Sequence, residues 1–190
     1  MHIEPFDNQN QPIVDVGNDR VPLNYFNIVK LRHGEHYSYQ LSGYESCVVP
    51  ATGRVSVKVE NKEIAEVGLR TEDVWDGEPE GVYVPTGLSC IVECLSETAE
   101  VFVAGAKFDQ TLAPFAVLAD DIDMVQYGSD DTKTHRKIKH ILGQKQHGLV
   151  GRLLVSELFT VGAGGWSGFP SHKHSVDRAG ETKHDETHNF

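Results

Sequence analysis

Short runs of β-branched and aromatic residues alternate with polar residues over the first 106 positions of the chain. The clearest run, RVSVKVE at residues 54–60, has an apolar side chain at every second position, a period typical of a strand with one buried face. Gly, Pro, Asn and Asp separate the runs, and Gly53 stands where a tight reversal requires a positive φ. Further strands are predicted at residues 25–31, 35–41, 45–50, 63–69, 81–84, 89–94 and 99–104. The pattern therefore predicts an all-β fold, a barrel or jelly roll of short antiparallel strands.

The pattern changes after residue 106, which suggests a division of the chain into three parts. Residues 1–106 are expected to form a complete N-terminal barrel, and residues 107–150 a connector with one short helix and one strand, Arg136–Leu142. The run RLLVSELFTV at residues 152–161 begins a new set of strands. Residues 151–190 are therefore expected to form the opening strands of a second barrel, within which the chain ends.

The composition of the chain narrows its location and its partners. There are 28 acidic and 17 basic residues, a formal net charge of −11, which argues against nucleic acid or anionic lipid as a partner. No apolar run approaches the ~20 residues of a membrane span, and the N-terminus lacks the features of a signal peptide. The odd number of cysteines, Cys47, Cys90 and Cys94, indicates free thiols in a reducing compartment. We expect a cytoplasmic protein with no membrane partner.

The residues best suited to bind a metal lie near the C-terminus. On a strand, His172 and His174 would point to the same face, and Glu186 follows in what should be the next strand. Two imidazoles and a carboxylate suit Zn²⁺, Mn²⁺, Fe²⁺ or Ni²⁺. The alternative is a solvated polar tail with some affinity for any divalent metal, against which stand the apolar neighbours Trp166 and Phe169. These two aromatic residues are candidates for lining a substrate pocket or for packing in the core.

Other polar clusters have simpler interpretations. His33 and His36 are expected at the surface, and the N-terminal barrel, which has no His-X-His pair, is expected to be metal-free. The basic stretch from Lys133 to His140 could grip a substrate carboxylate, but a solvated face is the preferred interpretation. No phosphate-binding loop, nucleophile elbow or dinucleotide fingerprint is present.

Several stretches of the chain resemble the 5-deoxy-glucuronate isomerase family of myo-inositol catabolism. The stretch of residues 154–174, with its VSELFT strand, GGWS turn and PSHKH motif, carries the likeness most specifically. The segments GEHYSYQLSGYESCVVPATGRVSVKV, VWDGEPEGVYVPTG and RKIKHIL extend it over most of the chain. The resemblance implies a cupin fold (a double-stranded β-helix), in which each family member has two barrels. More distantly, the chain resembles the ketol-isomerases of pectin breakdown.

The resemblance implies a function and a set of ligands. Carried over by position, the family's metal ligands fall on His172, His174 and Glu186, and a fourth histidine of the family has no counterpart before the chain ends. His184, on the same predicted strand face as Glu186, is a candidate substitute. The implied reaction is an aldose–ketose isomerisation of a small-molecule sugar acid, in which a divalent metal (Zn, Mn or Fe) stabilises an enediol. The sequence does not identify a catalytic base.

Whether the chain is itself an enzyme is left open by its sequence. A partial second barrel leaves strand edges unpaired, which allows three interpretations. The chain is truncated and has no catalytic activity, or it forms a homo-oligomer in which another subunit completes the site. In the third, its last residues bind a metal without turnover. The alternative function is a non-catalytic cupin, a sugar-binding or scaffold protein without the complete metal site. A cupin dioxygenase, which also uses two His and a carboxylate, is a weaker alternative.

Overall fold

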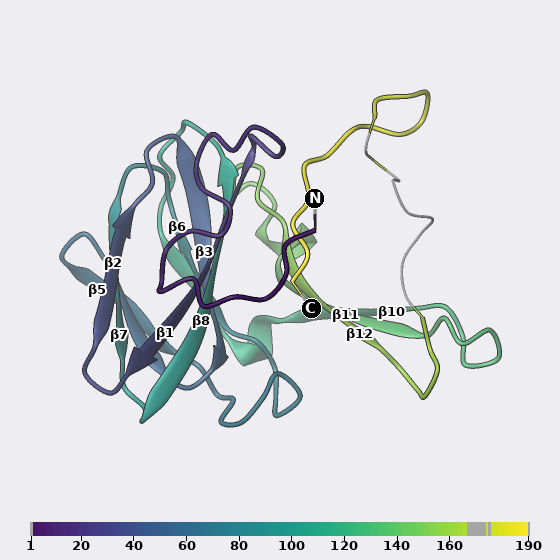
Figure 1. Cartoon of the computed structure of the whole chain (residues 1–190), viewed down its shortest axis with the longest axis horizontal. Coiled ribbons are helices and arrows are strands. Elements are labelled where there is room, and N and C mark those ends of the chain that lie inside the picture. The colour runs from purple at the N-terminus through teal and green to yellow at the C-terminus, as the bar shows by residue number, and fades with distance from the viewer. Residues whose placement is uncertain (1, 167–173, 175, 190) are drawn as a thin grey trace.

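The structure, a computed structural model, describes residues 2–166, 174 and 176–189. Over these residues the chain forms three antiparallel sheets, and its described part contains no α-helix. Two single-turn 3-10 helices, η1 (Ala119–Asp121) and η2 (Gln144–Gln146), interrupt the strands. Figure 1 shows two of the sheets forming the barrel and the third projecting from its side. The predicted all-β fold is therefore confirmed.

The N-terminal barrel is built from a five-stranded and a four-stranded sheet. The larger sheet has the order β1 (Asn24–Arg32), β8 (Thr98–Lys107), β3 (Tyr44–Thr52), β6 (Gly81–Val84), β9 (Phe115–Val117). The smaller sheet has the order β2 (His36–Gln40), β7 (Ser89–Cys94), β4 (Val55–Val59), β5 (Lys62–Val67). Consecutive strands alternate between the two sheets in several places, which is the arrangement of a jelly roll.

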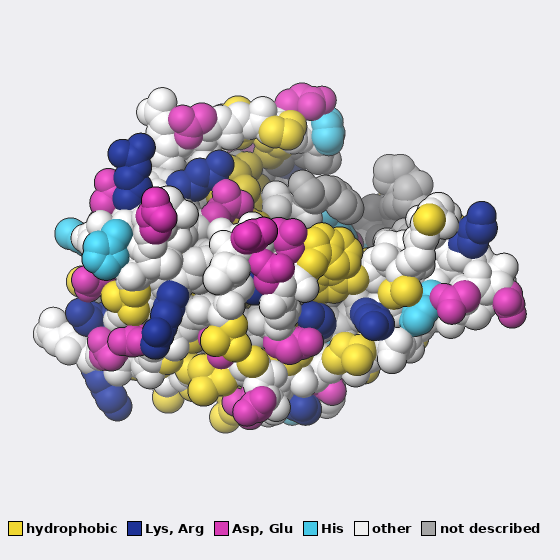
Figure 2. Space-filling model, turned by 90° about the horizontal axis from the view of Figure 1, so that it is seen from below, with side chains coloured by type: hydrophobic (Ala, Val, Ile, Leu, Met, Phe, Trp, Pro, Cys, Tyr) yellow, Lys and Arg dark blue, Asp and Glu magenta, His cyan; other side chains and the backbone are white. Residues whose placement is uncertain are grey.

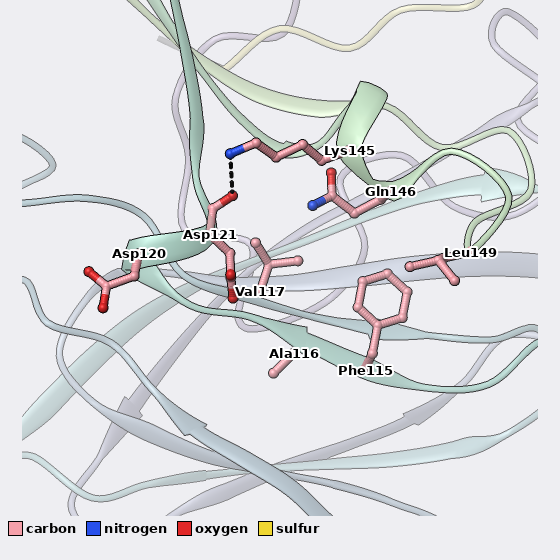
Figure 3. A pocket seen from close by; sticks show the side chains of 8 residues that line it. All are labelled: Phe115, Ala116, Val117, Asp120, Asp121, Lys145, Gln146 and Leu149. Carbon is pink, nitrogen blue, oxygen red and sulfur yellow. Dashed lines mark hydrogen bonds between the residues drawn. The ribbon is translucent and has the colours of Figure 1, made fainter.

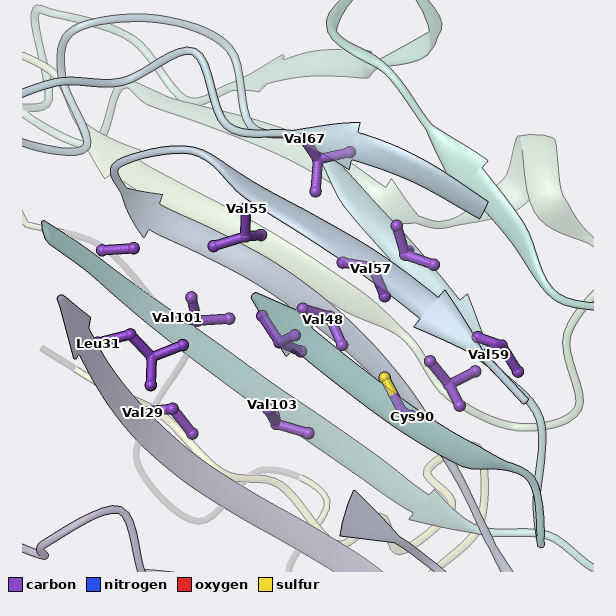
Figure 4. Packing of buried hydrophobic residues seen from close by; sticks show 14 of the residues in the cluster. Val29, Leu31, Val48, Val55, Val57, Val59, Val67, Cys90, Val101 and Val103 are labelled. Atoms are coloured by element: carbon purple, nitrogen blue, oxygen red, sulfur yellow. The ribbon is translucent and has the colours of Figure 1, made fainter. Parts of the chain in front are cut away.

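Valine side chains fill the space between these two sheets (Figure 4). Along β8, alternate residues are buried, so that Ala99, Val101 and Val103 face inward, while Val55 and Val57 of β4 are fully buried from the opposite sheet. Burial of one valine side chain stabilises the fold by about 1.5–2 kcal/mol, and β-branched side chains pack well on a pleated surface. The period of two seen in the sequence is thus the period of the barrel core.

The turn between β3 and β4 requires glycine, as the sequence predicted. Gly53 has φ of +79°, and its amide donates to the Arg70 carbonyl oxygen at 2.8 Å. A β-carbon there would collide with the carbonyl oxygen of Thr98 and with the backbone of Ala99. Both the backbone conformation and the space therefore exclude a larger residue.

The segment after residue 106 contains more strands than the sequence predicted. β9 pairs with β6 and so belongs to the larger barrel sheet. The third sheet has the order β10 (Asp123–Tyr127), β11 (Arg136–Leu142), β12 (Val155–Thr160), and its middle strand is the one predicted in the connector. The expected helix is replaced by single 3-10 turns. The boundaries at residues 106 and 150 stay a prediction.

A buried carboxylate joins the barrel to the chain that enters β12. Glu45 on β3 is 0% exposed, and its Oε2 accepts hydrogen bonds from the Tyr83 hydroxyl at 2.7 Å and from the Gly151 amide at 2.8 Å. Its Oε1 accepts from the amides of Arg152 and Leu153. Because all four partners are donors, an acceptor-only carboxylate satisfies them all, as buried polar groups require.

A loop between β5 and β6 holds the third sheet from its other side. The Arg70 guanidinium, 1% exposed, contacts both carboxylate oxygens of Glu157 on β12 at 2.7 and 2.6 Å, and it donates to the Gly77 carbonyl oxygen. The Trp75 ring lies 4.7 Å from the Phe159 ring, in an edge-on arrangement. A bidentate arginine–carboxylate pair fixes orientation as well as distance, so the loop sets the position of the strand that precedes the candidate site.

The three cysteines are buried free thiols, as expected. Burial raises the pKa of Cys90 to about 12 and that of Cys47 further. Thiols held in the protonated form are poor nucleophiles, so the side chains of Cys47 and Cys90 are structural. Among the described residues, no helix is long and apolar enough to cross a membrane.

Candidate functional site

The described part of the C-terminal segment forms a small hairpin that carries His174 and His184. Arg178 and Glu181 exchange backbone hydrogen bonds at 3.0 and 2.9 Å, and Gly180 between them has φ of +75°, as a tight turn requires. At the open end, the His184 amide donates to the His174 carbonyl oxygen at 3.0 Å. His174 and His184, ten positions apart in the sequence, are thus neighbours in this hairpin.

Glu181 is the centre of the hydrogen bonds that shape this hairpin. Its Oε2 accepts from Arg178 Nε at 2.9 Å, and its Oε1 accepts from the backbone amide of His174. The Arg178 guanidinium, followed by the His174 amide, lowers the pKa of Glu181 from 4.5 to about 2. The carboxylate is therefore ionised at neutral pH and holds the backbone of His174 in place.

The ring of His174 is oriented by a hydrogen bond at one of its two nitrogens. Its Nδ1 lies 3.0 Å from the Thr182 carbonyl oxygen. Because a carbonyl can only accept, Nδ1 carries the proton in that hydrogen bond, and in the neutral ring Nε2 keeps its lone pair. Metal-binding histidines commonly donate their second nitrogen to a carbonyl in this way. The His174 backbone also has φ of +64°, a conformation that is uncommon outside glycine.

The structure brings His174 together with His184, while Glu186 has another partner. The two imidazole centroids lie 4.7 Å apart, with 40° between the ring planes. The Glu186 carboxylate lies 3.5 Å from Nε2 of His188 and is 48% exposed. Among the described residues, no three His, Cys, Asp or Glu side chains are grouped closely enough to hold a metal. His172, the other predicted ligand, lies outside the described residues.

The remaining predicted residues are placed as follows. Trp166 is 58% exposed, and its backbone amide donates to the Lys133 carbonyl oxygen at 2.9 Å. It is therefore at the surface and not in the core. Phe169, its expected companion, lies outside the described residues. His33 and His36 are exposed, as predicted.

The basic stretch before β12 is less solvated than expected. Lys139 has a side chain only 14% exposed, and its ammonium lies 3.1 Å from the Glu78 carboxylate and 5.1 Å from the centroid of the Phe159 ring. A solvated face was therefore the wrong prediction for Lys139, because the loop before β6 covers it.

On the face shown in Figure 2, acidic and basic side chains are interspersed.

The end of the chain is anchored on the first strand of the barrel. The Leu23 amide donates to Asp185 Oδ2 at 3.0 Å, and the Asn24 side chain donates to the Thr187 hydroxyl at 2.9 Å. These bonds fix where the segment that carries His184 and Glu186 returns to the fold.

A separate hollow of about 440 Å³ lies between β9 and the two 3-10 helices (Figure 3). Phe115 and Leu149 supply apolar walls, and Lys145 Nζ spans the rim to the Asp121 carbonyl oxygen at 3.3 Å. The described candidates His174, Glu186 and Trp166 do not line it. The hollow is thus distinct from the histidine hairpin.

Comparison with known proteins identifies the family that shares these features. The KduI/IolB family matches residues 2–190. The chain belongs to the KduI/IolB family. Curated members similar to it include the 5-deoxy-glucuronate isomerases of Listeria monocytogenes serovar 1/2a, 30% identical over 168 residues, and of Halalkalibacterium halodurans, 31% identical over 166 residues. These matches cover 87% and 86% of the chain but 60% and 59% of the relatives, so the chain spans about three fifths of their length.

A solved structure supports the fold of this KduI/IolB member. An IolB-like protein from Salmonella typhimurium LT2 superimposes with a TM-score of 0.74 at 24% identity, over 85% of this chain and 59% of that one. This similarity shows the fold, while the match of the KduI/IolB family over residues 2–190 confirms the family resemblance inferred from the sequence. The sequence did not indicate Glu45, Arg70 or Glu181 as organising residues, because each acts through partners distant from it or through backbone amides.

Proposed function

We propose that this chain carries the metal-binding end of a sugar-acid aldose–ketose isomerase of the 5-deoxy-glucuronate isomerase type. The observation that carries the proposal is the orientation of His174 in a chain of the KduI/IolB family: its Nδ1 is bound to the Thr182 carbonyl oxygen at 3.0 Å, which leaves Nε2 for a ligand. His172, His174 and Glu186 are the residues proposed to hold a divalent Zn, Mn or Fe ion. The donor set fits, since imidazole and carboxylate suit all three metals.

The proposed roles of the protein residues follow from their contacts. A bound divalent cation would supply a Lewis acid that polarises a sugar carbonyl. Glu181 and Thr182 hold the backbone and ring of His174 in position. Exposed Trp166 offers a flat apolar surface to a sugar ring. No residue is assigned as the base that moves the proton between adjacent carbons.

The proposal extends to the setting in which the protein works. We propose a small-molecule sugar acid as the partner, inositol catabolism as the pathway, a cytoplasmic location and a homo-oligomer in which a second copy completes the site. The sugar acid is supported by the name of the relatives, and the pathway by the family resemblance seen in the sequence. The homo-oligomer is proposed because a partial second barrel would leave strand edges unpaired.

A second candidate function is a non-catalytic cupin that binds a sugar or serves as a scaffold. The contact that favours it is the pairing of Glu186 with His188 at 3.5 Å, which directs the carboxylate toward a different imidazole from His174. In such a protein the histidine hairpin would retain metal affinity without turnover.

Direct assay separates the two functions. The protein is incubated with 5-deoxy-glucuronate and Zn²⁺, Mn²⁺ or Fe²⁺ in D₂O, and the product is followed by NMR. Ketose formation with deuterium at the exchanged carbon, abolished in His174→Ala, supports the isomerase. Saturable sugar binding without conversion, in a sample with one metal per chain, supports the non-catalytic cupin.

A further inference from the structure

We propose that His184 is a metal ligand in this chain, and that His174 and His184 together form a two-imidazole site for a divalent transition-metal ion. The inference rests on the proposed function in one respect, since it takes His174 as a ligand. It adds a ligand that the resemblance to the isomerases does not supply at this position. Its basis is the hairpin that brings the two rings together.

The hairpin fixes the distance between the two histidines through backbone contacts. The amide of His184 bonds to the carbonyl of His174, and the turn at Gly180 closes the segment. Between them, the Lys183 amide donates to Asp177 Oδ1 at 2.9 Å. These contacts hold the backbones of His174 and His184 next to each other, although neither residue lies in a β-strand.

The separation of the rings matches that of two ligands on one ion. A metal–nitrogen bond of about 2.0–2.1 Å places the ring centroid about 3.2 Å from the ion, and ligands at about 90–110° then have centroids roughly 4.5–5.3 Å apart. The observed centroid distance is 4.7 Å. The distance between the rings therefore agrees with that of two imidazole ligands on one ion.

The orientation of His174 supports the same conclusion. Its Nδ1 is held by the carbonyl oxygen of Thr182, two residues before His184 in the returning arm of the hairpin. The arm that supplies the second imidazole therefore also determines which nitrogen of the first ring is left for a ligand.

Cobalt titration of the whole chain and of three variants tests the site. Co²⁺ binding is followed by its visible absorption and by calorimetry in His174→Ala, His184→Ala and His36→Ala. His36 is the matched control, because it is an exposed histidine on β2. We expect one Co²⁺ per wild-type chain, an affinity about 10–100-fold weaker in both hairpin variants, and a change of less than about twofold in the control. Circular dichroism verifies that each variant keeps the barrel.

The outcomes distinguish the inference from the function on which it rests. Weaker binding in His174→Ala with unchanged binding in His184→Ala would overturn the inference and leave His174 as a ligand. Unchanged binding in both variants, or no Co²⁺ binding by the wild-type chain, would overturn the inference and the proposed metal site together. Imidazole ¹⁵N NMR with Zn²⁺ gives a second measurement on the unmodified protein, in which a nitrogen of His184 must shift on binding.

Discussion

Glu45 offers a direct test of how the barrel is joined to the segment that leads to β12. The variant Glu45→Gln replaces one carboxylate oxygen by an amide nitrogen at a position that is 0% exposed. If the remaining oxygen stays with Arg152 and Leu153, the Tyr83 hydroxyl can rotate to accept from the new amide. The Gly151 amide cannot, because it would face another N–H donor.

The expected loss of stability follows from this geometry. One hydrogen bond to a charged group is lost, worth about 1.5–3 kcal/mol, and a buried donor is left unsatisfied. The bonds to Arg152 and Leu153 also weaken, because the neutral amide oxygen replaces a charged acceptor. We therefore expect Glu45→Gln to lower the free energy of unfolding by about 2–4 kcal/mol.

Urea unfolding followed by circular dichroism measures this loss. Glu93→Gln is the control, since Glu93 has a side chain 40% exposed and lies 3.6 Å from Lys58, and we expect a change of less than about 0.5–1 kcal/mol there. Hydrogen exchange adds a local readout, in which the amides of residues 151–153 should lose protection before the barrel does. A loss below about 1 kcal/mol for Glu45→Gln would refute the claim that this carboxylate holds the junction.

Three further changes test other contacts. Gly53→Ala should destabilise the protein by more than about 3 kcal/mol in the same urea assay, because its β-carbon meets backbone atoms. The control is Gly34→Ala, where φ is +76° and the space around the β-carbon is open, and we expect a loss of only about 1 kcal/mol there. Arg70→Ala should cost about 3–5 kcal/mol, against less than about 1 kcal/mol for exposed Arg54→Ala, and equal losses would contradict the role of the buried pair. Because its folded pKa is lowered from 4.5 to about 2, Glu181 stabilises the hairpin fully above pH 4.5 and loses this effect as the pH falls toward 2; a carboxyl ¹³C titration midpoint above pH 4 would contradict the hydrogen bonds assigned to it.

Strands rich in β-branched and apolar residues between turn residues were predictable from sequence, whereas short or edge strands were not. The predicted ranges 81–84, 89–94 and 136–142 coincide with β6, β7 and β11. β9 has only three residues, too few for a period to be visible, and it exists because β6 offers it an edge. β10 reads DMVQY and lies at the edge of a three-stranded sheet, where Met124 and Tyr127 are exposed, so its sequence does not show one apolar and one polar face.

At the candidate site, too, a short sequence motif was predictable, whereas contacts between residues distant in the sequence were not. The HKH motif pointed to His174. Its contact with His184 depends on a turn that brings together two residues ten positions apart in the sequence. Glu186 was expected as a ligand because it falls in a predicted next strand and by the position of the family's ligands. In the structure its carboxylate lies 3.5 Å from His188, and its role as a ligand stays a prediction.

The contrast between the barrel and the hairpin has a consequence for how a metal would act. The barrel is held by buried valines, whereas between residues 176 and 189 the side chains are mostly exposed and the contacts are polar. Exposed polar contacts are each worth about 1 kcal/mol or less, so the hairpin has little stability of its own. If His174 and His184, one from each arm of the hairpin, bind the same metal ion, the free energy of metal binding would stabilise the folded hairpin, as in other small metal sites. The anchors at Leu23 and Asn24 would hold the far end of that segment to the barrel. Metal-dependent protection of the His174–His184 amides, with unchanged protection in β1 and β8, is the pattern that this coupling requires.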